Sequence, residues 1–167
     1  MKITIYTDGA AKGNPGRAGW GAVIIFGDND KLKVRKVIKL KVLEIGGFSS
    51  HATNNIMELT APIKALKYIL ARQDLAKSNI EIISDSKYVI LGITEWIGNW
   101  VKNNWRNAQK KPVMNRELWE ELYELNQELK PKWAYVKGHH EDKYNHRADL
   151  IATSFAEGEP VKLENAG

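Results

Sequence analysis

The N-terminal segment is the feature that most limits how this chain can fold. Residues 2–8 alternate between polar and apolar side chains and end on Asp8, and a turn rich in glycine, asparagine and proline follows at 13–16. The alternation predicts a β-strand, and the turn residues allow another backbone segment to approach closely. A second apolar run, at 80–84, ends in the same way on Asp85. Any fold of this chain must therefore place two acids at strand ends.

The remaining patterns give the order of the other elements. Strands are predicted at 19–26, 32–44 and 132–136, a loop at 46–52, and helices beginning near Thr53 or Asn54, after Asp85, at Asn115 and at Asn145. Three strands followed by alternating helices and strands predict an α/β fold with a mixed five-stranded sheet, antiparallel in its first three strands and parallel in the last two, and with helices on both faces. In such a sheet Asp8 and Asp85 lie at one edge, outside the carboxyl ends of the parallel strands.

Length and composition favour one domain. The 167 residues, 43% of them hydrophobic, suit a single core, and the longest apolar run, 22–26, is far shorter than the roughly 18 residues of a membrane helix. The absence of cysteine excludes disulfides and thiolate chemistry. With no secretory signal pattern at the start, we expect a cytoplasmic monomer with no membrane partner, folded over 1–157 and with a flexible tail over 158–167.

Four acids form the candidate reactive site: Asp8, Glu58, Asp85 and Asp149. Each alone has an ordinary interpretation, as a turn initiator, a charge near a helix N-terminus or a solvated residue. Together they flank loops at one rim of the predicted sheet, where clustered carboxylates repel unless a cation neutralises them. Oxygen ligands favour Mg²⁺ or Mn²⁺ over Zn²⁺. Two such ions can activate a water and stabilise the leaving oxygen of a phosphodiester.

Histidines cluster in the loop predicted between the last strand and the last helix. His139 follows a glycine and precedes Asp149 by ten residues, so the loop is able to fold back toward the acids. A histidine beside a metal site can move a proton at neutral pH. We interpret His140 and His146 as solvated loop residues.

The segment from Trp96 to Arg116 contains no acidic residue. Its basic and aromatic residues are Lys102, Arg106, Lys110, Lys111 and Arg116, with Trp96, Trp100 and Trp105. One interpretation is a helix whose tryptophans pack inward while the cations face water, which we expect for Trp96. The other is a protruding element whose cations bind phosphates and whose aromatics stack on sugar or base. The missing acids favour the second interpretation, which predicts affinity with little sequence preference.

Four motifs together resemble those of type 1 ribonuclease H, especially its bacterial form. They are Tyr6-Thr7-Asp8-Gly9 with Gly13-Asn14-Pro15-Gly16, Thr53 to Leu59, Ser84 to Val89, and Val136 to His139 with Asn145 to Asp149. The resemblance covers roughly residues 2–157. It implies a ribonuclease H-like sheet with a basic protrusion at about 96–116. It also implies endonucleolytic hydrolysis of the RNA strand of RNA–DNA hybrids, giving 5′-phosphate and 3′-hydroxyl ends.

The resemblance also implies roles for single residues. Asp8, Glu58, Asp85 and Asp149 match metal ligands for Mg²⁺, with Mn²⁺ as a substitute, and His139 matches a mobile residue of proton transfer or product release. Asn14 and Asn54 match positions in the minor groove, Thr53 and Asn115 match positions that bind a DNA phosphate, and Trp100 matches an aromatic of the DNA channel. The basic segment adds Lys102 and Trp105 to this substrate-binding set. Contacts to the 2′-hydroxyl would distinguish RNA from DNA.

Three features depart from the family pattern. His51 stands where an arginine is common, Lys87 where a glutamine is common, and the segment 26–51 is longer than usual. Rival interpretations are another nuclease of the same fold, such as a resolvase or integrase core, a hybrid-binding module without catalysis, and a structural nucleoprotein. The Glu58 helix and the basic protrusion argue against the first rival and the four retained acids against the second. The third leaves the polar rim unexplained.

Overall fold

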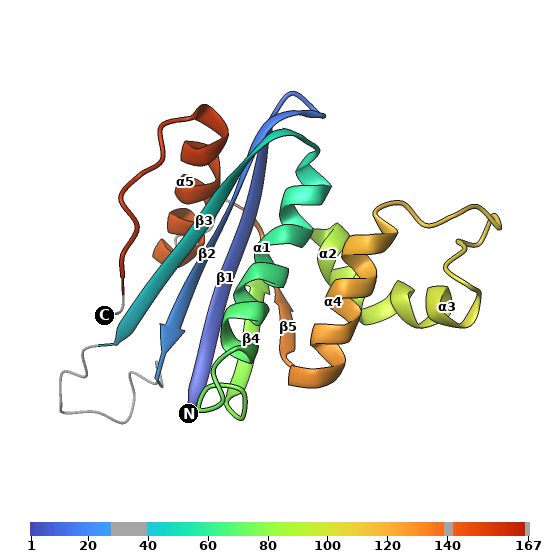
Figure 1. The fold of residues 1–167 in the computed structure, drawn as a ribbon, viewed down its shortest axis with the longest axis horizontal. Coiled ribbons are helices and arrows are strands. Elements are labelled where there is room, and N and C mark those ends of the chain that lie inside the picture. The colour runs from blue at the N-terminus through green and yellow to red at the C-terminus, as the bar shows by residue number, and fades with distance from the viewer. Residues whose placement is uncertain (28–39, 139–141, 166–167) are drawn as a thin grey trace.

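The computed structural model describes residues 1–27, 40–138 and 142–165. Its centre is a five-stranded sheet in the order β3-β2-β1-β4-β5 (Figure 1). The strands are β1 (Lys2–Lys12), β2 (Gly16–Phe26), β3 (Lys41–Ala52), β4 (Asn79–Ser84) and β5 (Lys132–Tyr135). The pairs β1–β2 and β2–β3 are antiparallel, whereas β1–β4 and β4–β5 are parallel. The predicted mixed sheet is therefore confirmed.

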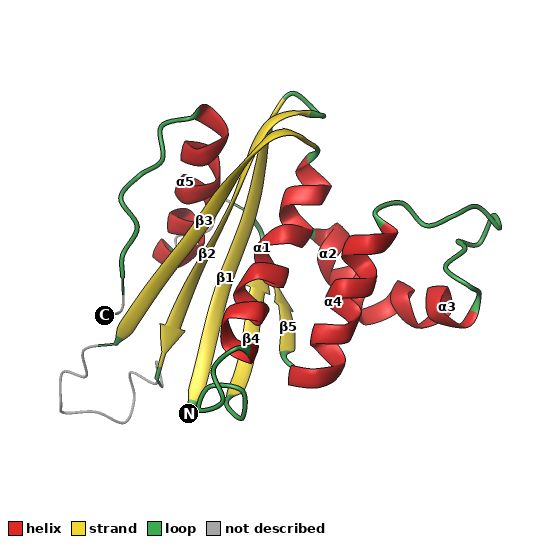
Figure 2. Cartoon of the chain, viewed as in Figure 1, coloured by secondary structure: helices red, strands yellow, loops and turns green. Residues whose placement is uncertain are grey.

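Helices cover both faces of the sheet (Figure 2). They are α1 (Asn54–Leu70), α2 (Lys87–Leu91), α3 (Ile97–Lys102), α4 (Arg116–Leu129) and α5 (Lys143–Glu157), with a π-helical turn, η1 (Gly92–Trp96), between α2 and α3. Helix α1 packs on β1 and β2 and against α4, while α5 packs on the same two strands from the other face. No helix in the described part of the chain is long and apolar enough to cross a membrane.

The alternation along β1 divides its side chains between two apolar cores. Ile3 and Ile5 are fully buried in the larger core, to which α1 also contributes, whereas Tyr6 belongs to the smaller core beneath α5. On β2, a Cβ at Gly19 would lie 2.2 Å from the carbonyl oxygen of Ala152 in α5. The missing side chain therefore lets α5 lie directly against the sheet.

Strand β3 extends further than its sequence pattern predicts. We expected a strand over 32–44 and a loop over 46–52, but β3 continues through the whole of the second range. Residues 28–39 lie outside the described chain, so the first part of the expected strand is not tested. The glycines that suggested a loop are sites of close packing instead, because a Cβ at Gly47 would lie 2.5 Å from the indole nitrogen of Trp20. The expected loop at 46–52 is wrong.

The end of the chain also differs from the flexible tail expected over 158–167. The Glu44 amide donates to the carbonyl oxygen of Glu164 at 2.8 Å, and the Glu164 amide donates to the Glu44 carboxylate at 2.7 Å. Val161 and Leu163 pack against the core beneath α5. Residues 159–164 form no helix or strand, but they are hydrogen-bonded to β3 and α5.

Candidate active site

Three carboxylates from three elements meet at one edge of the sheet. Asp8 belongs to β1, Glu58 to α1, and Asp85 directly follows β4; one carboxylate oxygen of each lies within 4.8 Å of the others. The parallel ladder pairs Thr7 with Ser84. The residue after each of these is an aspartate, so Asp8 and Asp85 lie at the same level. Only Asp85 follows the end of its strand. The expectation that Asp8 ends a strand is wrong, because β1 stays paired with β2 beyond Asp8 and continues to Lys12.

Glu58 reaches this edge because α1 crosses β1 at Gly9. A Cβ at Gly9 would lie 2.5 Å from the Glu58 amide nitrogen, so no side chain fits without displacement of the helix. Thr53 caps α1, and its hydroxyl accepts a hydrogen bond from the Ile56 amide at 3.2 Å. The sequence thus fixes both where α1 begins and how closely it approaches β1.

The pKa values of Asp8 and Glu58 are both raised by burial and by the charges of neighbouring acids. Burial, followed by the negative charge of Asp85, raises the pKa of Asp8 to about 8. Burial, followed by the charge of Asp8, raises the pKa of Glu58 well above its ordinary value. Among the described residues the buried Oε2 of Glu58 has no hydrogen-bond partner. This set of crowded carboxylate oxygens, with Oε2 of Glu58 buried and unpaired, fits a hard divalent cation, whose charge would relieve the repulsion.

Asp149 flanks this group without joining it. It is exposed on α5 and lies outside the set of three acids, yet its charge helps to raise the pKa of Asp8. The structure therefore shows a close trio with a fourth acid beside it, where the sequence predicts one cradle of four. His139 lies outside the described residues, so its expected place beside the acids is not tested.

The start of α5 depends on Asp142, a residue that the sequence analysis missed. Its carboxylate accepts hydrogen bonds from the amides of Tyr144 and Asn145 at 2.9 and 3.4 Å and from the Tyr6 hydroxyl at 3.0 Å. Because Asp142 provides the cap, α5 begins at Lys143 rather than at Asn145 as we expected. The sequence did carry a signal for this helix start, because aspartate is a common N-cap residue and Asp142 stands at the end of a polar loop.

Asn14 and Asn54, which match positions that contact the minor groove of the substrate, are hydrogen-bonded to each other. The side-chain oxygen of Asn14, in the turn between β1 and β2, accepts a hydrogen bond from the Asn54 amide at 3.1 Å. Both residues are exposed, and Asn54 opens α1 one turn before Glu58. The pair therefore presents amide groups to solvent near the acids.

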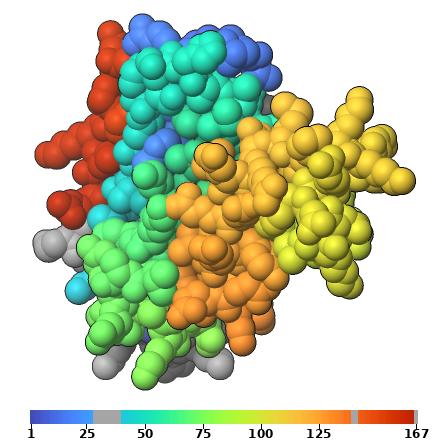
Figure 3. All heavy atoms as spheres, turned by 45° about the vertical axis from the view of Figure 1, so that its right-hand side comes forward, coloured from blue at the N-terminus to red at the C-terminus, as the bar shows by residue number. Residues whose placement is uncertain are grey.

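The segment 96–116 projects beyond α4, away from the sheet (Figures 1 and 3). Its five basic side chains, at positions 102, 106, 110, 111 and 116, are all exposed. Trp96 is 36% exposed, so the expectation that it packs inward is wrong. The side chains of Trp100 and Trp105 are half-buried. Trp100 packs edge-on against Trp119, with 5.3 Å between the ring centroids. The tryptophans thus anchor the base of the protrusion while its cations face water.

Asn115 occupies the predicted N-cap position of α4, but its side chain makes no capping bond. Its backbone is left-handed, with φ 59°, and its side-chain amide donates to the Tyr88 hydroxyl at 3.1 Å. The same hydroxyl accepts from the indole of Trp119 at 2.9 Å. Tyr88 therefore holds Asn115 in place, a role that its apolar helical spacing did not reveal.

The sheet order and the acids gathered at its edge define the ribonuclease H-like class of α/β proteins. LC9-RNase H1, a type 1 RNase H with the type 2 active-site motif, superimposes with a TM-score of 0.76 at 20% identity, over 99% of this chain and 75% of that one. The foamy viral protease-reverse transcriptase, in complex with an RNA/DNA hybrid, superimposes with a TM-score of 0.75 at 20% identity, over 93% of this chain and 20% of that one. At these identities the likeness shows the fold alone.

Sequence similarity defines the family. The RNase H family profile matches residues 1–157. The ribonuclease H of Thermosynechococcus vestitus is 47% identical over 159 residues, which are 95% of this chain and 91% of that protein. The ribonuclease H of Ruthia magnifica is 46% identical over 151 residues, 90% of this chain and 92% of that protein. The chain belongs to the ribonuclease H family and is a nuclease.

Proposed function

We propose that this protein is an endoribonuclease that hydrolyses the RNA strand of RNA–DNA hybrids and leaves 5′-phosphate and 3′-hydroxyl ends. The observation that carries the proposal is the trio Asp8, Glu58 and Asp85 within 4.8 Å, in a chain of the ribonuclease H family. Two structural neighbours, LC11-RNase H1 and the foamy viral enzyme, were solved in complex with an RNA/DNA hybrid. Residues 1–157 are proposed to form one catalytic domain.

Mg²⁺ is the proposed cofactor, with Mn²⁺ as a substitute. Asp8, Glu58 and Asp85 would hold it, and Asp149 is proposed as a further ligand from α5. Paired ions of this kind supply an activated water and stabilisation of the leaving oxygen. The donor set supports a hard cation because the trio offers only oxygen atoms. His139 is proposed to move a proton or to assist product release.

The proposed substrate surface runs from the acids to the protrusion. Its residues are Asn14, Thr53, Asn54, Trp100, Lys102, Trp105 and Asn115. Asn14 and Asn54 are proposed to face the minor groove, where the 2′-hydroxyls lie. Thr53 and Asn115 would bind a DNA phosphate, and the exposed cations of the protrusion would bind further phosphates without reading sequence. We propose that the protein acts as a monomer in the cytoplasm.

The test is gel analysis of four labelled substrates, namely single-stranded RNA, duplex RNA, DNA and RNA–DNA hybrid, each with and without Mg²⁺. We expect internal cleavage of the RNA strand of the hybrid alone, and only with the metal present. The product ends are checked by phosphatase and ligase treatment. Cleavage of single-stranded RNA, or cleavage of the hybrid in the presence of EDTA, would overturn the proposal.

A further inference from the structure

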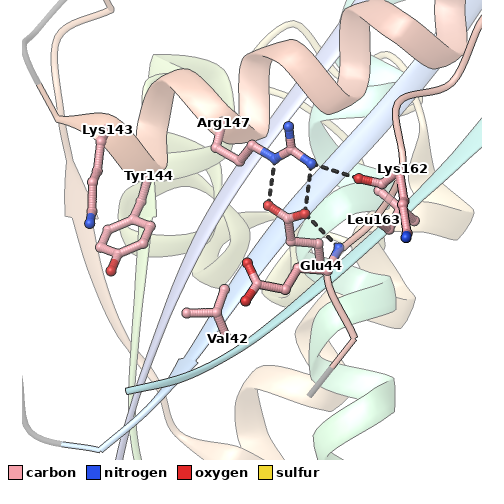
Figure 4. A pocket seen from close by; sticks show the side chains of 8 residues that line it. Val42, Glu44, Lys143, Tyr144, Arg147, Lys162 and Leu163 are labelled. Atoms are coloured by element: carbon pink, nitrogen blue, oxygen red, sulfur yellow. Dashed lines mark hydrogen bonds and ion pairs between the residues drawn. The ribbon is translucent and has the colours of Figure 1, made fainter. Parts of the chain in front are cut away.

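An ion pair between the buried Glu44 and the half-buried Arg147 joins the edge strand β3 to the helix that carries Asp149 (Figure 4). The Arg147 guanidinium donates from Nε and Nη2 to the two carboxylate oxygens of Glu44, at 2.6 and 2.8 Å. Arg147 Nη2 also donates to the Lys162 carbonyl oxygen at 2.8 Å, and the Glu164 amide donates to Glu44 at 2.7 Å. We call Glu44, Arg147 and residues 162–164 the C-terminal clamp.

The clamp has the features of a rigid contact. Glu44 is only 6% exposed, and both of its oxygens are bonded to Arg147. Burial alone would raise the pKa of Glu44, but the hydrogen bonds from Arg147 and the Glu164 amide lower it below the ordinary value. A bidentate guanidinium–carboxylate pair fixes orientation as well as distance. The pair therefore restricts how α5 can rotate or slide relative to β3.

The other end of α5 offers a natural comparison. Glu157 forms an ion pair with Lys12 of β1 at 2.9 Å, but both side chains are about half exposed, at 48% and 52%. Exposed pairs of this kind contribute little, because water screens them and both side chains lose freedom. The two ion pairs tie the same helix to the same sheet, and they differ in burial and geometry.

The orientation of α5 matters for the site because Asp149 lies two residues after Arg147. Side chains two residues apart on an α-helix project about 200° apart. Arg147 contacts Glu44 and the C-terminal segment, while Asp149 is exposed and acts on the pKa of Asp8. In Figure 1, no other helix of the described residues lies on the same face of the sheet as α5. Its orientation therefore depends on the sheet and on the clamp.

We propose that Glu44 is a positioning residue for Asp149, and that it acts through Arg147 and the C-terminal segment. The clamp sets the rotation of α5, and with it the affinity of the acid cluster for its cation. This inference rests on the proposed function, because it takes Asp149 to be a metal ligand. No residue of the clamp belongs to the acid trio or to the proposed substrate surface. Loss of the clamp is thus expected to change the cation requirement and not the affinity for the hybrid.

The test compares Glu44→Gln with Glu157→Gln in the full chain, at a temperature where both variants are folded. Mn²⁺ binding to the free protein is measured by calorimetry, and Mg²⁺ is titrated in the hybrid cleavage assay. For Glu44→Gln we expect about tenfold weaker cation binding and a matching rise in the Mg²⁺ needed for half-maximal cleavage. KM for the hybrid at saturating Mg²⁺ is expected to stay at the wild-type value, and Glu157→Gln should match wild type in every measurement.

Arg147→Lys provides a second variant should Glu44→Gln fail to fold. It keeps the positive charge but loses the two parallel hydrogen bonds, so a smaller shift in the same direction is expected. Wild-type cation binding in a folded clamp variant, even with a lowered melting temperature, would show that the clamp is purely structural and would overturn the inference. Cleavage of the hybrid by the wild-type protein in the absence of Mg²⁺ would instead overturn the proposed function.

Discussion

Asp8 and Asp85 lie side by side because each follows the last paired residue of one parallel ladder, Thr7 on β1 and Ser84 on β4. Backbone pairing, and not attraction between side chains, brings the two carboxylates together. The sheet therefore holds two carboxyl groups close together, and when both are ionised their repulsion destabilises the folded protein until a cation or a proton removes it.

Replacing Asp85 by Asn removes one charged oxygen, a proposed metal ligand, from the trio with little change of shape. We expect cleavage of a labelled hybrid to fall at least about a hundredfold, while hybrid binding measured in EDTA is retained. Asp74→Asn is the control, since Asp74 is exposed and lies in the connection before β4 begins, whereas Asp85 follows the end of that strand. Substantial turnover by the Asp85 variant would contradict its assignment as a ligand.

The raised pKa of Asp8 predicts a dependence of stability on pH in the absence of metal. The folded state, with a pKa of about 8, binds more protons than the unfolded state, where an ordinary aspartate titrates near about 4. This contribution to stability is fully present below about pH 4 and is lost as the pH rises toward 8. We expect Asp8→Asn to be more stable than wild type at pH 8 in EDTA, by about 1–3 kcal/mol.

Urea unfolding at pH 5 and pH 8 measures this effect, with both proteins in EDTA. The difference in unfolding free energy between Asp8→Asn and wild type should be larger at pH 8. Added Mg²⁺ should stabilise wild type at pH 8 more than it stabilises the variant, because binding to the folded state alone raises stability. An equal difference at both pH values would show that Asp8 titrates normally.

Gly9 controls how closely α1 approaches β1. In Gly9→Ala the new Cβ would meet the Glu58 amide nitrogen at 2.5 Å, so the helix must shift. We expect a loss of about 1–3 kcal/mol in the free energy of unfolding, together with weaker cation binding. Gly98→Ala in α3 is the matched control, because nothing lies within 4 Å of its Cβ position. That variant should be as stable as wild type or more stable by up to about 1 kcal/mol.

The salt dependence of hybrid binding tests the protrusion. Changing Lys102, Arg106, Lys110 and Lys111 to Ala should weaken binding and flatten the plot of log affinity against log salt by about one unit for each phosphate that the protein no longer neutralises. The control changes four exposed lysines near the amino-terminal ends of β1, β4 and β5, namely Lys2, Lys77, Lys130 and Lys132. If both sets change the slope equally, the effect reflects net charge and not a binding surface.

Local patterns predicted the order of the strands and the meeting of Asp8, Glu58 and Asp85. The predicted cradle of four acids also included Asp149, which lies outside this trio. The alternation before Asp8 and the apolar run before Asp85 each indicate a strand. Parallel pairing of these strands then places the two aspartates side by side, although β1 itself continues to Lys12. The clamp could not be predicted in this way, since Glu44 and Arg147 are 103 residues apart. Arg147 lies within the motif at 145–149, but nothing in that motif indicates Glu44 as its partner. The glycines within 46–52 were misleading, because in β3 they make room for Trp20 and α5 instead of forming a turn.

The C-terminal segment has a consequence for how copies of this protein meet. β3 is an outer strand of the sheet, and an outer strand presents free amide and carbonyl groups that can pair with another molecule. The bond from the Glu44 amide to the Glu164 carbonyl oxygen occupies part of that edge from within the same chain. The segment thus covers part of the edge at which two molecules could pair through their backbones. Removal of residues 159–167 is expected to expose that part of β3.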